Sequence, residues 1–202
     1  MADFYPPGSR ELQDRFDTRR LADRLEERLV RDHFTDEDRA FIRPLPMFFL
    51  ATADEQGQPQ CSYKGGAPGF VRIVDDHTLA FPSYDGNGMF LSLGNLGQNP
   101  QVGLLFIDFE AQQRLRVNGV ASLLDADPLL ADYPEAQLII RVRATQIFPN
   151  CPRYIHKLQV VELSTFVPRA GCETPVPNWK RRPWSREVLP AADPALKEPI
   201  ID

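Results

Sequence analysis

The stretch VGLLFIDF (102–109), the tripeptide EAQ (110–112) and the stretch QRLRVNGVASLL (113–124) together decide the fold class. The first stretch is almost entirely apolar, as expected of a strand that is buried on both faces. The last one alternates, with Leu115, Val117 and Gly119 on one side and mostly polar residues on the other. The short polar segment between them is typical of a connection between antiparallel strands. We therefore predict a long antiparallel pair.

Shorter apolar runs on both sides of this pair predict further strands. Turn signals separate them, such as Gly57 and the segment Asp75-Asp76-His77. The further predicted strands are residues 47–53, 59–64, 70–74, 78–82, 138–148 and 158–163. We expect six to seven of all these segments to pair in a mainly β (α+β) fold, an antiparallel barrel or sandwich with peripheral helices.

The predicted helices lie outside these strands. Ser9 is predicted to cap one, and Thr35 with Asp38 resembles a capping box that opens a second. Two further segments are predicted to be helical: residues 87–98, with Asn87 as the N-cap, and residues 125–136. One thin apolar stripe of the first helical segment is expected to face the body of the protein: Leu12, Phe16, Leu21, Leu25 and Leu29.

A chain of 202 residues is long enough for one β-rich domain with a real core. We assign residues 1–45 to an N-terminal helical extension, 46–168 to the barrel domain and 169–202 to a C-terminal tail. The tail is rich in proline and lacks an apolar period, so we predict that it is extended.

Composition argues against several classes of protein. The net charge of −5 provides no global positive field for nucleic acid or anionic lipid. No apolar stretch approaches the roughly 18 residues that span a bilayer. Three cysteines without paired spacing indicate neither a disulfide framework nor a zinc site. The three histidines have no metal-ligand spacing. These features predict a cytoplasmic protein without a bound metal.

Five segments carry a resemblance to a known family, and their order and spacing matter more than any one of them. They are CSYKGG (61–66), LAFPSYDGNGM (79–89), NPQVGLLF (99–106), RLRVNG (114–119) and FPNCPRYI (148–155). Together they resemble the FMN-binding split barrels of the pyridoxamine 5'-phosphate oxidase family over roughly residues 44–163.

The resemblance implies a six- to seven-stranded FMN-binding split barrel, a homodimer with the cofactor at the interface, and a small-molecule substrate. The oxidase that makes pyridoxal phosphate carries a Ser-Arg-Lys-like run at the start of its phosphate-binding helix. The matching residues 87–90 contain no cation, so oxidation of vitamin B6 is not carried over.

Candidate cofactor residues follow from these segments. Lys64 precedes two glycines and is predicted to pair with the phosphate. Arg114 and Arg116 are two residues apart on one strand, so both are expected to point to the same face. Arg114 is predicted to tune the flavin ring. Arg116 is predicted either to contact the cofactor or to form a salt bridge across the dimer interface. The remaining residues, predicted to hold the phosphate or line its site, are Ser62, Ser83, Tyr84, Asn87, Gly88 and Met89.

A second group is predicted to line the substrate pocket or the pocket of the partner subunit: Asn150, Arg153, Tyr154, Trp184 and Arg186. Cys151, which lies in the same predicted loop as Asn150 and Arg153, is expected to be a small buried residue rather than a redox centre.

No residue is singled out as an obligatory acid or base. The sequence therefore predicts an FMN-dependent oxidoreductase acting on a small organic substrate. Two alternatives remain open, an F420-dependent reductase of the same fold and a non-catalytic flavin- or haem-binding protein.

Overall fold

The computed structural model describes residues 4–124 and 126–201. The chain divides into two compact units, Met1–Val161 and Glu162–Asp202. Each unit is described by itself below. The division falls at residue 162, whereas the sequence placed the start of the tail at residue 169.

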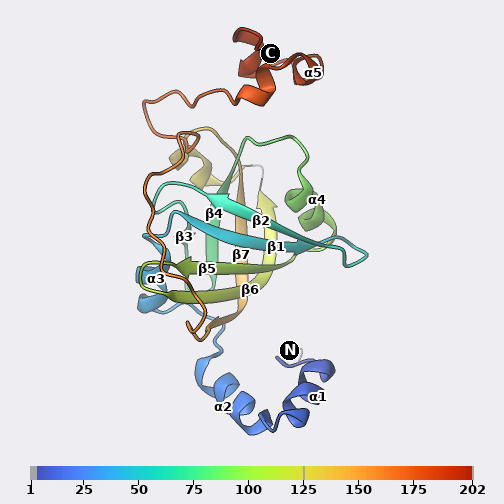
Figure 1. The fold of residues 1–202 in the computed structure, drawn as a ribbon, viewed down its shortest axis with the longest axis vertical. Coiled ribbons are helices and arrows are strands. Elements are labelled where there is room, and N and C mark those ends of the chain that lie inside the picture. Colours follow the sequence, from blue (N-terminus) through green and yellow to red (C-terminus); the bar gives the residue numbers. More distant parts are fainter. Residues whose placement is uncertain (1–3, 125, 202) are drawn as a thin grey trace. The chain divides into compact units, whose positions relative to one another are not determined.

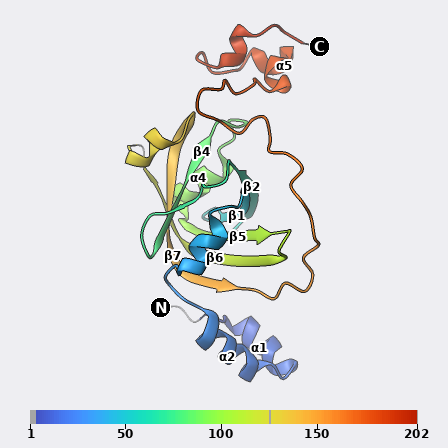
Figure 2. The ribbon, with the colours of Figure 1, turned by 90° about the vertical axis from the view of Figure 1, so that its left-hand side faces the viewer.

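The first unit is built on one antiparallel sheet, shown in Figures 1 and 2. Within the described residues it has seven strands in the order β2-β1-β5-β6-β7-β4-β3. The strands are β1 (Met47–Ala53), β2 (Pro59–Gly65), β3 (Arg72–Ile73), β4 (Thr78–Tyr84), β5 (Gln101–Asp108), β6 (Gln113–Leu124) and β7 (Ala136–Pro149). The predicted pair of long strands is β5 and β6, which confirms the antiparallel β fold.

One face of the sheet forms the core. Leu50, Leu104, Val117 and Ile147 lie opposite one another across four neighbouring strands and are almost fully buried. They join three fully buried phenylalanines, Phe48, Phe81 and Phe106. Burying apolar surface of this kind is the main favourable term in folding.

The first unit also contains helices. They are α1 (Pro7–Arg15), α2 (Arg19–Leu29), α3 (Asp36–Ile42) and α4 (Leu91–Gln98), with a 3₁₀ turn η1 (Pro128–Asp132) before β7. The capping box of Thr35 and Asp38 is confirmed at the start of α3. Within the predicted helix 125–136 only the short turn η1 forms, between Asp127 and Tyr133. Residue 125 lies outside the described residues.

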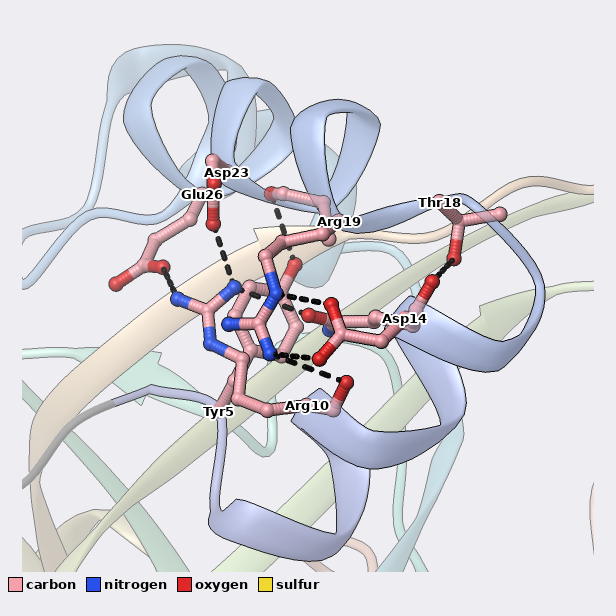
Figure 3. Close-up of polar contacts among 9 residues, drawn as sticks. Tyr5, Arg10, Asp14, Thr18, Arg19, Asp23 and Glu26 are labelled. Atoms are coloured by element: carbon pink, nitrogen blue, oxygen red, sulfur yellow. Dashed lines mark hydrogen bonds and ion pairs between the residues drawn. The ribbon is translucent and has the colours of Figure 1, made fainter.

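Helices α1 and α2 pair through charged side chains, as Figure 3 shows. Arg10 lies 2.5 Å from Asp23 and 3.8 Å from Glu26, and Arg19 pairs with Asp14. Pro6, not Ser9, is the N-cap of α1, because the first turn begins at Pro7. The predicted apolar stripe does not face the body: its five side chains are all exposed.

The predicted strand 158–163 is wrong. After β7 the described part of the first unit continues without a strand, and residue 158 makes one backbone bond, from its N–H to the carbonyl of Phe109. A lone bond of this kind does not form a ladder.

The second unit is not an extended tail. It contains the 3₁₀ turns η2 (Asn178–Arg181) and η3 (Pro194–Lys197) and the short helix α5 (Pro183–Arg186). A buried ion pair joins Lys180 to Asp193 at 2.9 Å, and Trp179 stacks on Trp184. These contacts could not be read from the proline content.

Among the described residues, no helix is both long and apolar enough to cross a membrane.

Gly119 permits a bulge in the pairing of β6 with β7. The register shifts between Asn118 and Gly119. A Cβ atom at Gly119 would lie 2.3 Å from the carbonyl oxygen of Arg143 and 2.9 Å from Val142 Cγ1. Side chains of L-residues therefore do not fit at this position unless the two strands separate.

We expect Gly119→Ala to lower the free energy of unfolding by about 1–3 kcal/mol, because the methyl group overpacks the strand pair. Urea unfolding followed by circular dichroism measures this loss. Gly94→Ala is the matched control: a Cβ atom there meets nothing within 4 Å, and alanine favours a helix. Equal stability of the two variants would contradict the packing argument.

The carboxylate of Asp193 is expected to stabilise the second unit. Burial by itself raises the pKa of Asp193. Hydrogen bonds from Lys180 and from the Ala195 N–H, together with the charge of Lys180, lower it by more, so the pKa of Asp193 is below its ordinary value. The carboxylate therefore stabilises the unit above its unfolded pKa of about 4, and this contribution is lost as the pH falls through the lower folded pKa.

We expect Asp193→Asn to lower the free energy of unfolding of this unit by about 3–5 kcal/mol, because it breaks a buried ion pair by removing one of its two charges. Both tryptophans of the chain lie in this unit, so tryptophan fluorescence during urea unfolding reports on it alone. Glu187→Gln, an exposed carboxylate in the same unit, is the control. An unchanged unfolding midpoint in Asp193→Asn would contradict the role of the ion pair.

Candidate functional site

A cavity of about 400 Å³ lies where β2, the end of β4 and the start of α4 meet. Its volume is within the range of small-ligand pockets. Seven of the nine predicted cofactor residues line it: Ser62, Lys64, Ser83, Tyr84, Asn87, Gly88 and Met89. The sequence thus identified residues from two distant segments that the fold brings to one cavity.

Lys64 is the cation of this cavity. It lies on β2 opposite the buried Phe48 of β1, and its side chain is half-buried. Burial lowers the pKa of Lys64. Within the described part of the chain, Lys64 has no hydrogen bond or ion pair, and none of the described residues lining the cavity is acidic. A half-buried ammonium without a carboxylate nearby favours an anionic ligand.

The loop before α4 forms the opposite wall. The Asn87 side-chain oxygen accepts a hydrogen bond from the Met89 N–H at 3.0 Å. Gly88 and Phe90 both have positive φ, 74° and 49°. Because residues in this conformation cannot belong to an α-helix, α4 begins after them, and its N-cap is Phe90 rather than the predicted Asn87.

No side chain caps α4, and its first turn (residues 91–93) lines the cavity. The N-terminal end of a helix carries partial positive charge and free backbone donors, so it adds to the attraction of Lys64 for an anion. The helix itself is held in place by Asn95, which donates to the Thr52 hydroxyl at 3.0 Å.

Hydroxyl groups complete the polar lining. Ser62 and Ser92 share a hydrogen bond of 2.6 Å between their Oγ atoms. Burial first, and then the charge of Glu135, raise the pKa of Tyr84, so its phenol stays a neutral donor. Sequence reasoning missed Ser92 and Tyr63, which also line the cavity. Tyr63 lay within the quoted CSYKGG segment, whereas Ser92 had no signal beyond its place in a helix.

Arg114 and Arg116 do not line this cavity within one chain. Both belong to β6, and Arg116 is exposed on the outer sheet face, opposite Leu105 and Phe148. Arg114 donates from Nη2 to the carbonyl of Cys151 at 2.8 Å and lines a second cavity together with Asn150.

The remaining predicted residues lie elsewhere. Arg153 and Tyr154 are exposed in the loop after β7. Cys151 is exposed, which corrects its predicted burial: the loop leaves the sheet after Pro149. A hydrogen bond from Arg153 Nε lowers the pKa of the Cys151 thiol.

Trp184 and Arg186 belong to the second unit. Trp184 is exposed, with its ring stacked on Trp179. The Arg186 guanidinium donates to the carbonyls of Ala195, Leu196 and Glu198 at 2.5–2.8 Å, which gives it a structural role in that unit.

In the described ranges, no three His, Cys, Asp or Glu side chains come together as metal ligands would.

Comparisons with known proteins match the chain to one family. The model of the pyridoxamine 5'-phosphate oxidase family matches residues 34–165. No curated protein matches the chain. Several solved structures are similar at low identity. HupZ of Group A Streptococcus is 19% identical, covering 57% of this chain and 93% of that one, with a TM-score of 0.47.

Two further solved structures are similar over more than half of this chain. An FMN-binding protein of Syntrophomonas wolfei is 13% identical, covering 69% of this chain and 97% of its own, with a TM-score of 0.44. The heme storage protein HutZ of Vibrio cholerae is 22% identical, covering 55% and 91%, with a TM-score of 0.41.

Proposed function

Because the chain belongs to the pyridoxamine 5'-phosphate oxidase family, whose fold it shares, we propose that it binds FMN and acts as an FMN-dependent oxidoreductase on a small organic substrate. One observation carries the proposal: the cavity offers a half-buried cation, and no described residue that lines the cavity carries a negative charge. A phosphate monoester supplies the missing negative charge.

The residues present fit the phosphate of such a cofactor. Lys64 provides the positive charge, Ser62, Ser83 and Tyr84 provide hydroxyl donors, and the start of α4 provides backbone donors. The family resemblance alone suggests FMN rather than another phosphorylated ligand. When bound, FMN supplies two-electron transfer to or from an organic molecule. The chain's part is to bind the phosphate and to keep acidic groups away from it.

We further propose that the protein is a homodimer that pairs through the outer face of its sheet. Tyr63, Phe49, Leu105, Arg116 and Phe148 form one row across five strands on that face. Four of these five side chains are aromatic or aliphatic, and Tyr63 is 62% exposed. Phe49, Leu105 and Phe148 are partly exposed, and the ring of Phe4 packs against that of Phe148. A face that combines partly exposed apolar area with arginine is typical of a protein interface.

Tyr63 connects the two proposals, because it belongs both to this row and to the lining of the cavity. A partner chain seated on the row would therefore contact a residue that lines the cavity. This arrangement supports a cofactor site at the dimer interface.

We expect Lys64→Met to weaken FMN binding about 10- to 100-fold, since a charge-assisted hydrogen bond contributes about 1.5–3 kcal/mol. The quenching of flavin fluorescence on binding measures the affinity. Lys64→Arg should recover part of it, and Lys157→Met, at an exposed lysine outside the cavity, should change nothing.

Riboflavin, which lacks the phosphate, isolates the contact. Its affinity should be equal in the wild-type protein and in Lys64→Met. Equal FMN affinity of these two proteins would contradict the phosphate role of Lys64. Binding of F420 or haem, with no uptake of FMN, would overturn the FMN proposal in favour of the matching alternative.

Leu105→Lys tests the dimer. Placing a positive charge in the middle of the row should convert the protein to a monomer in sedimentation equilibrium, because the ammonium would be buried beside Arg116, its neighbour across the strand pair, and the row contains no carboxylate. Leu12→Lys is the control, since Leu12 is an exposed leucine of α1 outside the row. Circular dichroism confirms that both variants are folded. A wild-type monomer, or a Leu105→Lys dimer, would contradict the proposed interface.

A further inference from the structure

A third cavity, of about 450 Å³, lies between the last turn of α3 and β3. Residues 68, 69 and 71, in the loop between β2 and β3, complete its wall. It shares no lining residue with the cavity that contains Lys64. This cavity takes no part in the function proposed above.

The charged side chains that line this cavity are all arginines: Arg39, Arg43 and Arg72. Arg39 and Arg43 are four residues apart at the end of α3, a spacing at which like charges repel. The C-terminal end of a helix favours cations, which accounts for these two. It does not account for Arg72, which belongs to β3. Two separate elements thus bring positive charge to one cavity.

Arg39 and Arg72 are held in place from outside the cavity. Arg39 Nη2 lies 2.8 Å from Asp76 Oδ1, and Arg72 Nη1 lies 2.5 Å from Asp132 Oδ2. The Arg72 guanidinium also lies 4.8 Å from the centre of the Tyr133 ring. Neither carboxylate lines the cavity.

Both guanidiniums keep donors for a ligand. Each ion pair occupies one nitrogen, whereas a guanidinium carries five N–H donors. The side chains of Arg39 and Arg72 are 33% and 40% exposed, so a molecule in the cavity can reach them. Side chains that are fixed before binding lose less freedom when a ligand arrives.

Arg43 adds a third positive charge. Its side chain is exposed and has no hydrogen bond or ion pair within the described part of the chain. Three arginines and the two carboxylates behind them leave one positive charge in excess. A doubly negative tetrahedral anion fits this arrangement, because the planar fork of arginine binds phosphate through two parallel hydrogen bonds.

We propose that this cavity is a second anion site, which binds a dianionic phosphate group, either as free phosphate or as a small phosphate monoester. Arg39 and Arg72 form its fixed part, and Arg43 provides the third positive charge. No group is transferred and no bond is made in this binding step.

Inorganic phosphate and phenyl phosphate are the probes, at about pH 7.5, where both are mainly dianions. The backbone amide signal of Gly69 in a ¹H–¹⁵N correlation spectrum reports on this cavity, and that of Gly88 reports on the cavity of Lys64. Phosphate at millimolar concentration should shift the Gly69 signal in the wild-type protein and in Lys64→Met alike. Acetate, with a single charge, should bind at least about tenfold more weakly.

The two probes distinguish the two sources of the phosphate group. Pro68, Val71 and Ile73 line the same cavity and offer apolar contacts to an organic substituent. Tighter binding of phenyl phosphate than of inorganic phosphate identifies a monoester as the ligand. Equal or weaker binding of phenyl phosphate identifies the free ion.

Arg43→Met should weaken the binding of both probes about tenfold or more. It should leave the urea unfolding midpoint unchanged, because the Arg43 side chain has no partner to lose among the described residues. Arg28→Met, at an exposed arginine of α2 outside the cavity, is the control and should bind both probes like the wild-type protein. Arg72→Lys keeps a positive charge but lacks the planar fork, so it should also weaken binding.

Four results would overturn the proposal. The first is no shift of the Gly69 signal with either probe, and the second is a shift with acetate at the same concentration as with phosphate. The third is equal phosphate affinity of Arg43→Met and the wild-type protein. The fourth is a loss of FMN affinity in Arg43→Met, which would assign the cavity to the cofactor. If the wild-type protein fails to bind FMN while phosphate still shifts the Gly69 signal, the proposed function alone is refuted.

Discussion

The curl of the sheet is the constraint on which the candidate site depends. β2 and β4 stand first and sixth in the strand order, with four strands between them, yet both line the same cavity. A flat sheet would hold these strands far apart, since neighbouring strands are spaced by about 4.8 Å. The sheet bends enough to bring β2 and β4 together. The length of β6 and β7, 12 and 14 residues, and the bulge at Gly119 allow this bend.

The sequence predicted the parts of the fold that depend on local pattern. The alternation in residues 113–124 identified β6, and the Thr35 capping box identified α3. The residues of the first cavity were found through resemblance, because Lys64 and Asn87 lie on separate segments and no local pattern links them.

The errors came from features that only tertiary structure reveals. The start of α4 depends on positive φ at Gly88 and Phe90, and a phenylalanine gives no signal for that conformation. The ion pair of Lys180 and Asp193 folds a proline-rich segment that has no apolar period. Arg114 lines a second cavity within the chain, because which cavity a strand residue lines depends on how the sheet bends, and its place beside the cofactor stays a prediction.

Tyr63 has a consequence for how the two proposed events depend on one another. Because the same side chain lies in the cavity and in the interface row, occupancy of the cavity and self-association are thermodynamically linked in the proposed dimer. The linkage is reciprocal: whatever the partner chain adds to cofactor affinity, the cofactor adds equally to the dimer. For the proposed dimer, the concentration of the chain would therefore be a variable of cofactor binding, and dilution alone would release the ligand.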